Sequence, residues 1–295
     1  MKRMTLSAIN IAIHPHPTPE VYERIFKRSA IFLKNKKQAI HVRGDQFATL
    51  TYPLRVKSAN SKGDAFAGEI LKFTEIKLDG DWLDLSTLES KAPEDIKDSV
   101  SIPEELRPNL HRFSYAIFPE VHKIVFQTEI GQSKTSPNII LHFFEKLFEI
   151  KEIKEGFDSV NLTIVPEKNK VEEILNIYQL KKLKITLTKP NPDELDDIDI
   201  EFEKHLNEEN ADYYIQEYSS KKEEQLTPSK RTRAIAKLAS INGEVWGKGK
   251  DREGKVITET TKSHNMQKKF RYDEKEKELP YTRFVRFAQD AIDDL

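Results

Sequence analysis

The 295-residue chain contains no cysteine. This absence excludes disulfide bonds, thiolate metal sites, zinc fingers and cysteine nucleophiles. Glycine is scarce as well, with 10 residues, and the sequence has no glycine-rich phosphate loop, dinucleotide-binding glycine motif or nucleophile elbow. No run of about 18 apolar residues occurs, so we expect no membrane span. The N-terminus lacks the pattern of a signal peptide, and we therefore expect a cytoplasmic protein.

Charge of one sign gathers in separate segments, although the net charge is only −1. Arg24–Arg43 holds seven basic residues and no acid, and Ser229–Tyr272 holds twelve Lys and Arg against four acids. Asn191–Asp212 holds ten acids and one lysine. Basic segments of this kind indicate a polyanion-binding surface, and the alternative is a set of solvated faces on a lysine-rich protein.

The first half of the chain has the pattern of a helix packed on strands. Apolar residues alternate over Thr5–His14, which predicts a strand buried on one face. Thr18 and Pro19 are typical of a helix start. Segments 39–43, 47–56 and 66–78 are rich in β-branched and aromatic residues and predict an antiparallel meander.

The second half begins with a strongly apolar helix that we expect to be central. Ser136 and Pro137 provide its N-cap and first turn. Strands at 160–165 and 183–188 around a short helix predict a βαβ unit. A hairpin around residues 251–254 and a C-terminal helix complete the pattern.

These patterns predict an α+β fold, mainly an antiparallel sheet with packed helices and a smaller inserted strand-helix-strand unit. We expect an N-terminal α+β domain over 1–155 and a small unit with the acidic helix over 156–227. Residues 228–295 should form a basic hairpin and helix that pack on the first domain.

The ingredients of nucleic-acid binding lie in the two basic segments. Trp246, Phe270 and Tyr272 stand among cations, and such rings stack on bases while lysine and arginine neutralise phosphates. The alternative is that these rings belong to the core. The candidate nucleic-acid-binding residues are Arg24, Lys27, Arg28, Lys34, Lys36, Lys37, Arg43, Lys230, Arg231, Arg233, Trp246, Lys248, Lys250, Arg252, Lys268, Lys269 and Arg271.

Two patterns would instead support metal chemistry. Asp64, Glu75 and Lys77 have an admissible spacing for a metal-dependent nuclease, in which two carboxylates hold Mg²⁺ and the lysine orients water. The histidine candidates for a transition metal are His14, His16 and His41. A solvated strand face and a capped strand-to-helix junction are the respective alternatives. We expect no cofactor, and whether the protein is an enzyme stays open.

The first third of the chain resembles an uncharacterised bacterial family of similar length, through Asn10–His16, Val42–Asp45, Phe73–Ile76 and Asp79–Trp82.

The middle of the chain carries a second resemblance. Asp158–Pro166, Lys170-Val171 and Leu183–Leu187 are similar to the strand-helix-strand unit of the phage-exclusion protein RexA and the DNA-binding subunit of the Kiwa defence system. This resemblance implies a dimeric, sequence-nonspecific DNA binder that acts against phage.

The leading hypothesis is therefore a homodimeric protein of bacterial antiviral defence that binds DNA or RNA without sequence preference. It requires the two basic segments to form one positive surface. A metal-dependent nuclease is one alternative. Another is a protein-interaction module whose acidic helix, within Asp193–Asp212, contacts a basic partner, such as a protein from the same defence locus.

Overall fold

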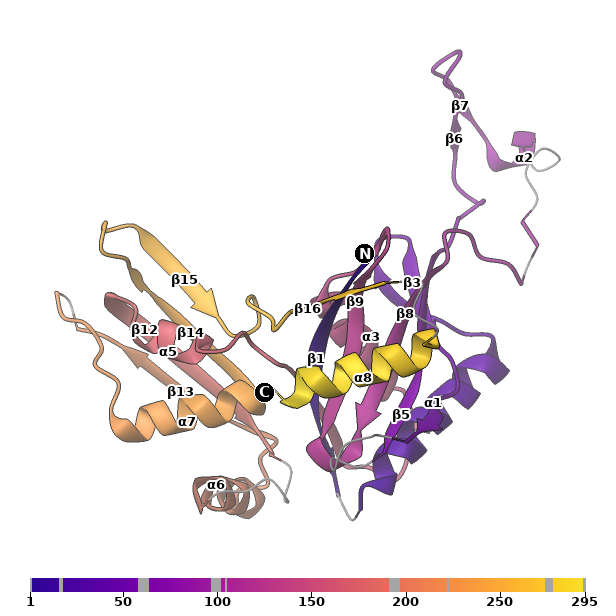
Figure 1. Ribbon diagram of the computed structural model, residues 1–295. Helices are drawn as coiled ribbons and strands as arrows, with labels where there is room; N and C mark the ends of the chain where they lie inside the picture. The colour runs from indigo at the N-terminus through magenta and orange to yellow at the C-terminus, as the bar shows by residue number, and fades with distance from the viewer. Residues whose placement is uncertain are drawn as a thin grey trace.

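A computed structural model of the chain describes residues 2–15, 18–57, 64–96, 102–103, 105–190, 197–221, 223–273 and 278–293. Two antiparallel sheets of unequal size organise these residues into a large and a small lobe, which lie side by side in Figure 1. Along the part of the chain that the structure describes, no helix combines the length and the apolar character needed to cross a bilayer.

The large sheet has the central order β11-β1-β9-β8-β5-β3-β2, and β10, β16 and β4 pair at its margins. Its strands are β1 (Lys2–His14), β2 (Ile40–Arg43), β3 (Gln46–Leu50), β4 (Leu54–Val56), β5 (Ala65–Thr74), β8 (His111–Phe118), β9 (Lys123–Ile130), β10 (Ser133–Lys134), β11 (Ser159–Ile164) and β16 (Lys268–Tyr272). The strand β9 occupies one edge of β1. The other edge of β1 pairs with two strands, β16 along residues 2–6 and β11 along residues 9–14.

Helices cover both faces of the large sheet. The helices α1 (Glu20–Lys36), α3 (Pro137–Phe148) and α4 (Lys151–Lys154) pack with one face, and α8 (Pro280–Asp293) packs with the other. Alternate residues of β1 enter the two cores, with Ile9 and Ile11 toward α1 and α3 and with Leu6 and Ala8 toward α8. The prediction that this strand is buried on one face is therefore wrong, since α8 covers the second face.

The apolar helix α3 is central, as predicted. Its N-cap Ser136 accepts a hydrogen bond from the Ile139 amide at 3.3 Å. Phe143 and Phe144 are fully buried, and α3 contacts both β11 and β2, which are the two ends of the sheet order. The sheet thus curls around this helix.

The small sheet has the order β13-β12-β14-β15. Its strands are β12 (Gln179–Thr188), β13 (Tyr213–Ser219), β14 (Gly243–Lys250) and β15 (Val256–Thr260), and its helices are α5 (Lys170–Leu175), α6 (Asp197–Glu208) and α7 (Lys230–Ile241). Leu183, Ile185 and Val245 form its core with α5 and α7. The small lobe is inserted between β11 and β16 of the large sheet, which agrees with the predicted α+β fold with an inserted unit.

The structure divides the inserted segment differently from the expected βαβ unit. β11 pairs with β1 in the large sheet, whereas β12 belongs to the small sheet, so the two strands do not form one unit. The β14–β15 hairpin pairs with β12 rather than packing on the first domain. In the C-terminal segment, β16 and α8 are the elements that join the large lobe.

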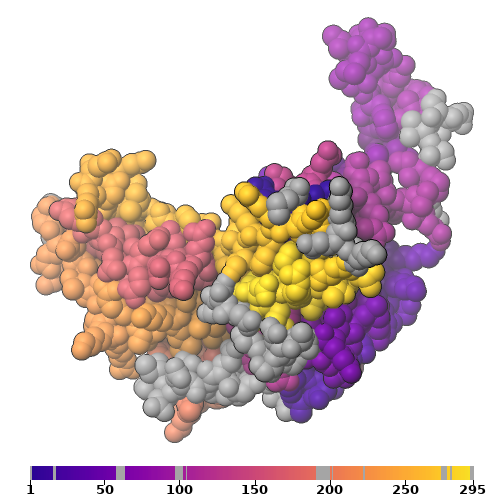
Figure 2. Space-filling model, in the orientation of Figure 1, coloured from indigo at the N-terminus to yellow at the C-terminus, as the bar shows by residue number. Residues whose placement is uncertain are grey.

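A short extension, here called the arm (residues 79–96), leaves the large lobe. It contains β6 (Trp82–Leu83), β7 (Ser90–Lys91) and α2 (Pro93–Ile96). The two strands pair with each other in a separate two-stranded sheet. The arm stands clear of the body in Figures 1 and 2. A short 3-10 helix, Pro119–Val121, connects β8 and β9.

Candidate nucleic-acid interface

Among the residues that the structure describes, helices pack on one face of the small sheet and leave the other face open. In β14, Val245, Gly247 and Gly249 are buried, and a Cβ added at Gly247 would lie 2.7 Å from the side chain of Ile174 in α5. These alternate residues therefore face the helices. Because side chains alternate along a strand, Trp246 and Lys248 point to the opposite side of the sheet.

The strand register shows which other residues share that side. Lys182 lies opposite Lys248, and Lys184 lies opposite Trp246. We define the open face by the residues that this register aligns: Lys182, Lys184, Thr186, Tyr213, Ile215, Glu217, Glu244, Trp246, Lys248, Lys250, Val256, Thr258 and Thr260.

Apolar side chains are exposed along the two outer strands of the open face. Tyr213 and Ile215 on β13 and Val256 on β15 are between 44% and 58% exposed. Trp246 is half-buried near the centre. An antiparallel sheet normally leaves a polar face to water, so exposed apolar groups mixed with cations are typical of a binding surface.

The open face carries four lysines and two acids, and the register places one of these acids, Glu217, opposite Lys184. The four lysines 182, 184, 248 and 250 make no ion pair or hydrogen bond through their side chains with the residues that the structure describes. Glu244 is already engaged, because Lys262 lies 3.1 Å from it and Thr260 donates a 2.6 Å hydrogen bond to it. Like charges directly opposite each other destabilise a sheet, so an anionic ligand would relieve the pairing of Lys182 with Lys248.

The acidic helix α6 lies on the other side of the small sheet. Phe202 of α6 is buried and its ring lies 5.5 Å from that of Tyr214. Tyr214 alternates with Tyr213 and Ile215, so it faces the helix layer. The helix α6 therefore does not cover the open face.

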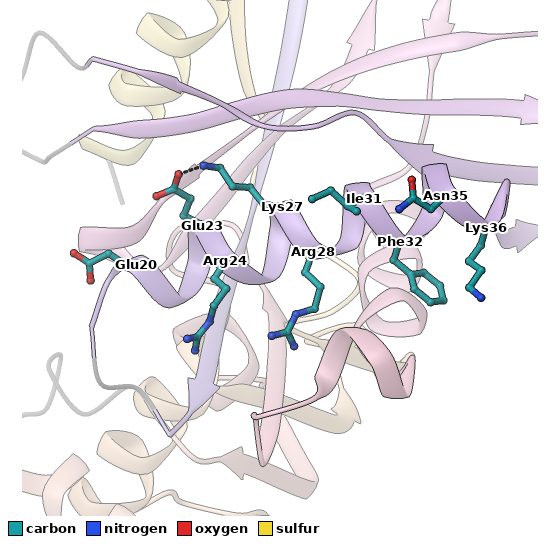
Figure 3. A pocket seen from close by; sticks show the side chains of 9 residues that line it. All are labelled: Glu20, Glu23, Arg24, Lys27, Arg28, Ile31, Phe32, Asn35 and Lys36. Carbon is teal, nitrogen blue, oxygen red and sulfur yellow. Dashed lines mark ion pairs between the residues drawn. The ribbon is translucent and has the colours of Figure 1, made fainter.

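Several predicted residues on α1 have contacts within the chain instead. Figure 3 shows Arg24, Lys27 and Arg28 on this helix, with the ion pair between Lys27 and Glu23. The guanidinium groups of Arg24 and Arg28 lie 5.3 and 5.7 Å from the centre of the Phe157 ring. Arg28 also donates to the carbonyl oxygens of Ile153 and Glu155 at 3.0 and 2.5 Å. These contacts join α1 to the region of α4, a structural role.

The remaining cations of the first basic segment lie at the surface of the large lobe. Lys27 forms an ion pair with Glu23 one turn away, and Lys37 lies 2.6 Å from Glu105. The exposed residues Lys34, Lys36 and Arg43 follow along the end of α1 and β2.

The second basic segment is divided among three elements. Arg233 on α7 binds Glu172 and Asn176 of the α5 region at 2.9 and 2.8 Å, and Lys230 and Arg231 lie on the same helix. Trp246, Lys248 and Lys250 belong to the open face, and Arg252 lies in the turn that follows.

The third element is β16, which carries Lys268, Lys269 and Arg271 in the large sheet. Its rings are core residues: Phe270 stacks on Phe287 at 4.4 Å, and Tyr272 is 8% exposed. The interpretation of these two rings as base-stacking groups is therefore wrong, and the core alternative is confirmed.

The predicted convergence of the two basic segments is wrong as well. In Figure 1, α1 lies in the large lobe and β14 in the small lobe, at opposite ends of the view. The small sheet is inserted between β11 and β16, which separates β14 from α1, while β16 pairs with β1 at the margin of the large sheet.

The predicted nuclease residues do not form a metal site. Asp64 precedes β5 and Glu75 follows it, so the length of an extended ten-residue strand, about 35 Å, separates them. Asp64 pairs with Arg55 at 2.7 Å, and Glu75 lies 3.8 Å from Arg107. Lys77 lies beyond the end of the strand.

The predicted histidine site is not assembled either. His14 lies on β1, where its Nε2 is 3.5 Å from the carbonyl oxygen of Lys189. His41 lies on β2, at the far end of the sheet order, and its Nε2 is 2.7 Å from the carbonyl oxygen of Gly44. His16 lies outside the described residues. Among the residues that are described, no group of three or more His, Asp or Glu could hold a metal ion.

Two lysines of the open face were missed by the sequence reasoning. Lys182 and Lys184 alternate with the buried residues Leu183 and Ile185 on β12. This period of two identifies one apolar and one basic face of a strand, and it is visible in the sequence. The search for long segments of one charge sign passed over it, because the three lysines of β12 lie within a single ten-residue strand.

The chain belongs to a family described as a domain of unknown function (DUF4747), whose sequence model matches residues 2–289. The expected membership of an uncharacterised family of about 300 residues is thus confirmed. The matched range includes both lobes and the arm. A comparison with curated proteins gives no match.

Proposed function

We propose that this protein binds single-stranded nucleic acid, DNA or RNA, without sequence preference, through the open face of the small sheet. The observation that carries the proposal is the set of four unpaired lysines around Trp246 on a sheet face without a helix. Lysines neutralise phosphates whatever the sequence, and an indole ring stacks on any base.

The layout of the open face supports a strand of nucleic acid lying across it. Lys182 and Lys184 on β12 and Lys248 and Lys250 on β14 form two short rows on neighbouring strands. Along one strand, alternate residues are about 7 Å apart, and neighbouring strands are separated by about 5 Å. Cations are thus close enough to contact successive phosphates while the ring of Trp246 stacks on a base.

The first experiment measures fluorescence anisotropy of labelled oligothymidylate and oligouridylate with the full chain. We expect binding at low salt that weakens as salt rises. The plot of log K against log salt concentration has a negative slope. In the double variant Lys182→Ala/Lys248→Ala this slope should be shallower by about 1.4, since each lost contact to a single strand removes about 0.7. Trp246→Ala should lose about 5- to 150-fold in affinity, which corresponds to about 1–3 kcal/mol per stacked base.

Matched controls lie on the other sides of the molecule. Lys230→Ala on α7 and Lys36→Ala on α1 remove exposed lysines that do not belong to the open face. We expect wild-type affinity and salt slope for both. The proposal is wrong if the wild-type chain does not bind at low salt, or if the control variants weaken binding as much as the open-face variants.

We propose further that nucleic-acid binding serves antiviral defence. The support is the resemblance of residues 158–187 to phage-defence proteins, and it is weakened by the assignment of β11 and β12 to different sheets. Phage plating on cells with and without the gene tests this role. If phage plate equally well on both kinds of cell, while the purified wild-type chain binds oligonucleotides, the binding proposal stands and the defence proposal is wrong.

A further inference from the structure

The arm exposes leucine side chains at its tip. Leu83, Leu85 and Leu88 are 61%, 81% and 75% exposed. Figures 1 and 2 show the arm projecting from the large lobe, with its tip pointing away from α1 of the same chain. Three exposed leucines on one small hairpin form an apolar surface that nothing described in the chain covers.

Hydrogen bonds within the arm fix its tip in one shape. The Asp84 carboxylate accepts from the amide and hydroxyl of Ser86 at 2.9 and 2.6 Å and lies 2.6 Å from Lys91. The Asp84 amide donates to the carbonyl oxygen of Glu89 at 3.0 Å. These bonds arrange the leucines before any contact is made, which lowers the entropic cost of binding.

The backbone at Leu88 supports a role for its side chain. Its φ of +59° lies in the left-handed region, where glycine or asparagine is favoured and a leucine is strained. The side chain is three-quarters exposed, so burial within the chain does not compensate for this strain. A leucine at this position is better explained by a contact with another molecule.

A groove beside α1 has the matching character. It is a depression of about 1120 Å³ between the end of α1, β3 and β5. The rings of Phe47 and Phe73 lie nearly parallel at 6.5 Å, and Leu50 and Leu71 also line it. Lys34 stands at its rim without an ion pair to any described residue. Such a groove accepts apolar side chains that are flanked by acids.

Charge complements shape between these two surfaces. The arm contains six acids and one lysine. The groove is lined by Lys34, Lys37 and Arg107 and by the acids Glu75 and Glu105. Lys37 pairs with Glu105 and Arg107 lies 3.8 Å from Glu75, so Lys34 is the lining cation that has no ion pair among the described residues. A surface and its complement on one chain can form a symmetric pair of identical contacts between two copies.

We propose that the arm of each chain docks in the groove beside α1 of a second copy, so that two chains form a dimer by reciprocal exchange of arms. Leu85 and Leu88 enter the groove against Phe47 and Phe73, and the arm's acids face Lys34 at its rim.

Engineered cysteines test the contact directly, because the chain has none of its own. A Leu85→Cys chain is mixed with an Asn35→Cys chain under mild oxidation, and Asn35 is an exposed residue that lines the groove. We expect a disulfide-linked product of twice the chain mass that contains both variants. As a control, Leu54→Cys, an exposed leucine on β4 outside the arm and the groove, should give no such product with Asn35→Cys.

The double variant Leu85→Cys/Asn35→Cys distinguishes exchange from folding back. Exchange predicts linkage between chains. Linkage within a single chain, or no linkage in the mixture, would overturn the proposal.

The mass in solution provides an independent measurement. Light scattering should give twice 34.3 kDa for the wild-type chain and about 34.3 kDa for Leu85→Ser/Leu88→Ser. Leu54→Ser should remain dimeric. A monomeric wild-type chain, or an arm variant that stays dimeric, contradicts the proposal. Because the open face lies in the other lobe, the monomeric arm variant should still bind oligonucleotides, so the two proposals fail independently.

Discussion

The two lobes differ in how many faces of their sheets are covered. Helices cover both faces of the large sheet, and its interior holds rings and aliphatic groups such as Phe26 and Phe144. Helices cover one face of the small sheet, and the other face presents lysines around Trp246. The comparison indicates that the large lobe contributes most of the stability, and it motivates the proposal that the small lobe binds nucleic acid on its uncovered face.

The largest effect is expected from a truncation in the large lobe. Phe144 is fully buried, and the centre of its ring lies 5.1 to 5.8 Å from the ring centres of Phe26, Phe143 and Phe148. Phe144→Ala should lower the free energy of unfolding by about 3–5 kcal/mol, as the loss of a buried aromatic ring does. Urea denaturation followed by far-UV circular dichroism measures it. A loss below about 1 kcal/mol would contradict the assignment of the stabilising core to this lobe.

A smaller effect is expected on the covered side of the small sheet. Gly247→Ala places a methyl group 2.7 Å from Ile174 of α5, and overpacking of this kind costs about 1–3 kcal/mol. Denaturation followed by the fluorescence of Trp246, in a Trp82→Phe background, measures the change.

The matched control is Gly80→Ala in the arm, where a Cβ meets no atom within 4 Å. It should leave stability unchanged. Below its unfolding transition, Gly247→Ala should keep the oligonucleotide affinity of the wild type, because its side chain points away from the open face. A large loss of affinity would show that the two faces are not independent.

The smallest effect concerns acid sensitivity in the large sheet. Arg3, Lys134 and Thr5 surround Glu129 and lower the pKa of its carboxyl to about 2, with the hydrogen bonds from Arg3 as the main cause. Because the pKa is lower in the folded chain than its ordinary value of 4.5, the ionised carboxylate stabilises the fold at pH values above about 4.5. This contribution is lost as the pH falls from about 4.5 to about 2.

Thermal unfolding across this pH range measures the contribution of Glu129. Glu129→Gln should unfold at a lower temperature than the wild type above pH 4.5, and the gap should close toward pH 2. Glu253→Gln, which changes an exposed acid of the turn between β14 and β15, should follow the wild-type curve. A gap of constant size at every pH would contradict the expected role of the carboxylate.

Local patterns in the sequence predicted the elements better than their partners. Ser136 and Pro137 mark the start of α3, and the alternation in β1 identifies a strand. Neither pattern says which sheet a strand joins. β11 and β12 have similar apolar sequences, and long-range pairing with β1 and β14 separates them.

The candidate site was predicted only in part for the same reason. Trp246, Lys248 and Lys250 were included, since they lie in a dense basic segment. Lys182 and Lys184 lie about 60 residues away in the chain and reach the open face through the register of β12 with β14. The roles of Arg24 and Arg28 depend on the position of Phe157, which helical spacing cannot give.

The position of β16 and α8 has a consequence for the order in which the protein is made. Both elements come after the inserted lobe, yet α8 covers Met4, Leu6 and Ala8 of the first strand. During synthesis this apolar side of β1 stays uncovered until Pro280–Asp293 has left the ribosome. The large lobe therefore completes its fold only after α8 has been synthesised, so its first strand waits for a helix that is nearly 270 residues further along the chain.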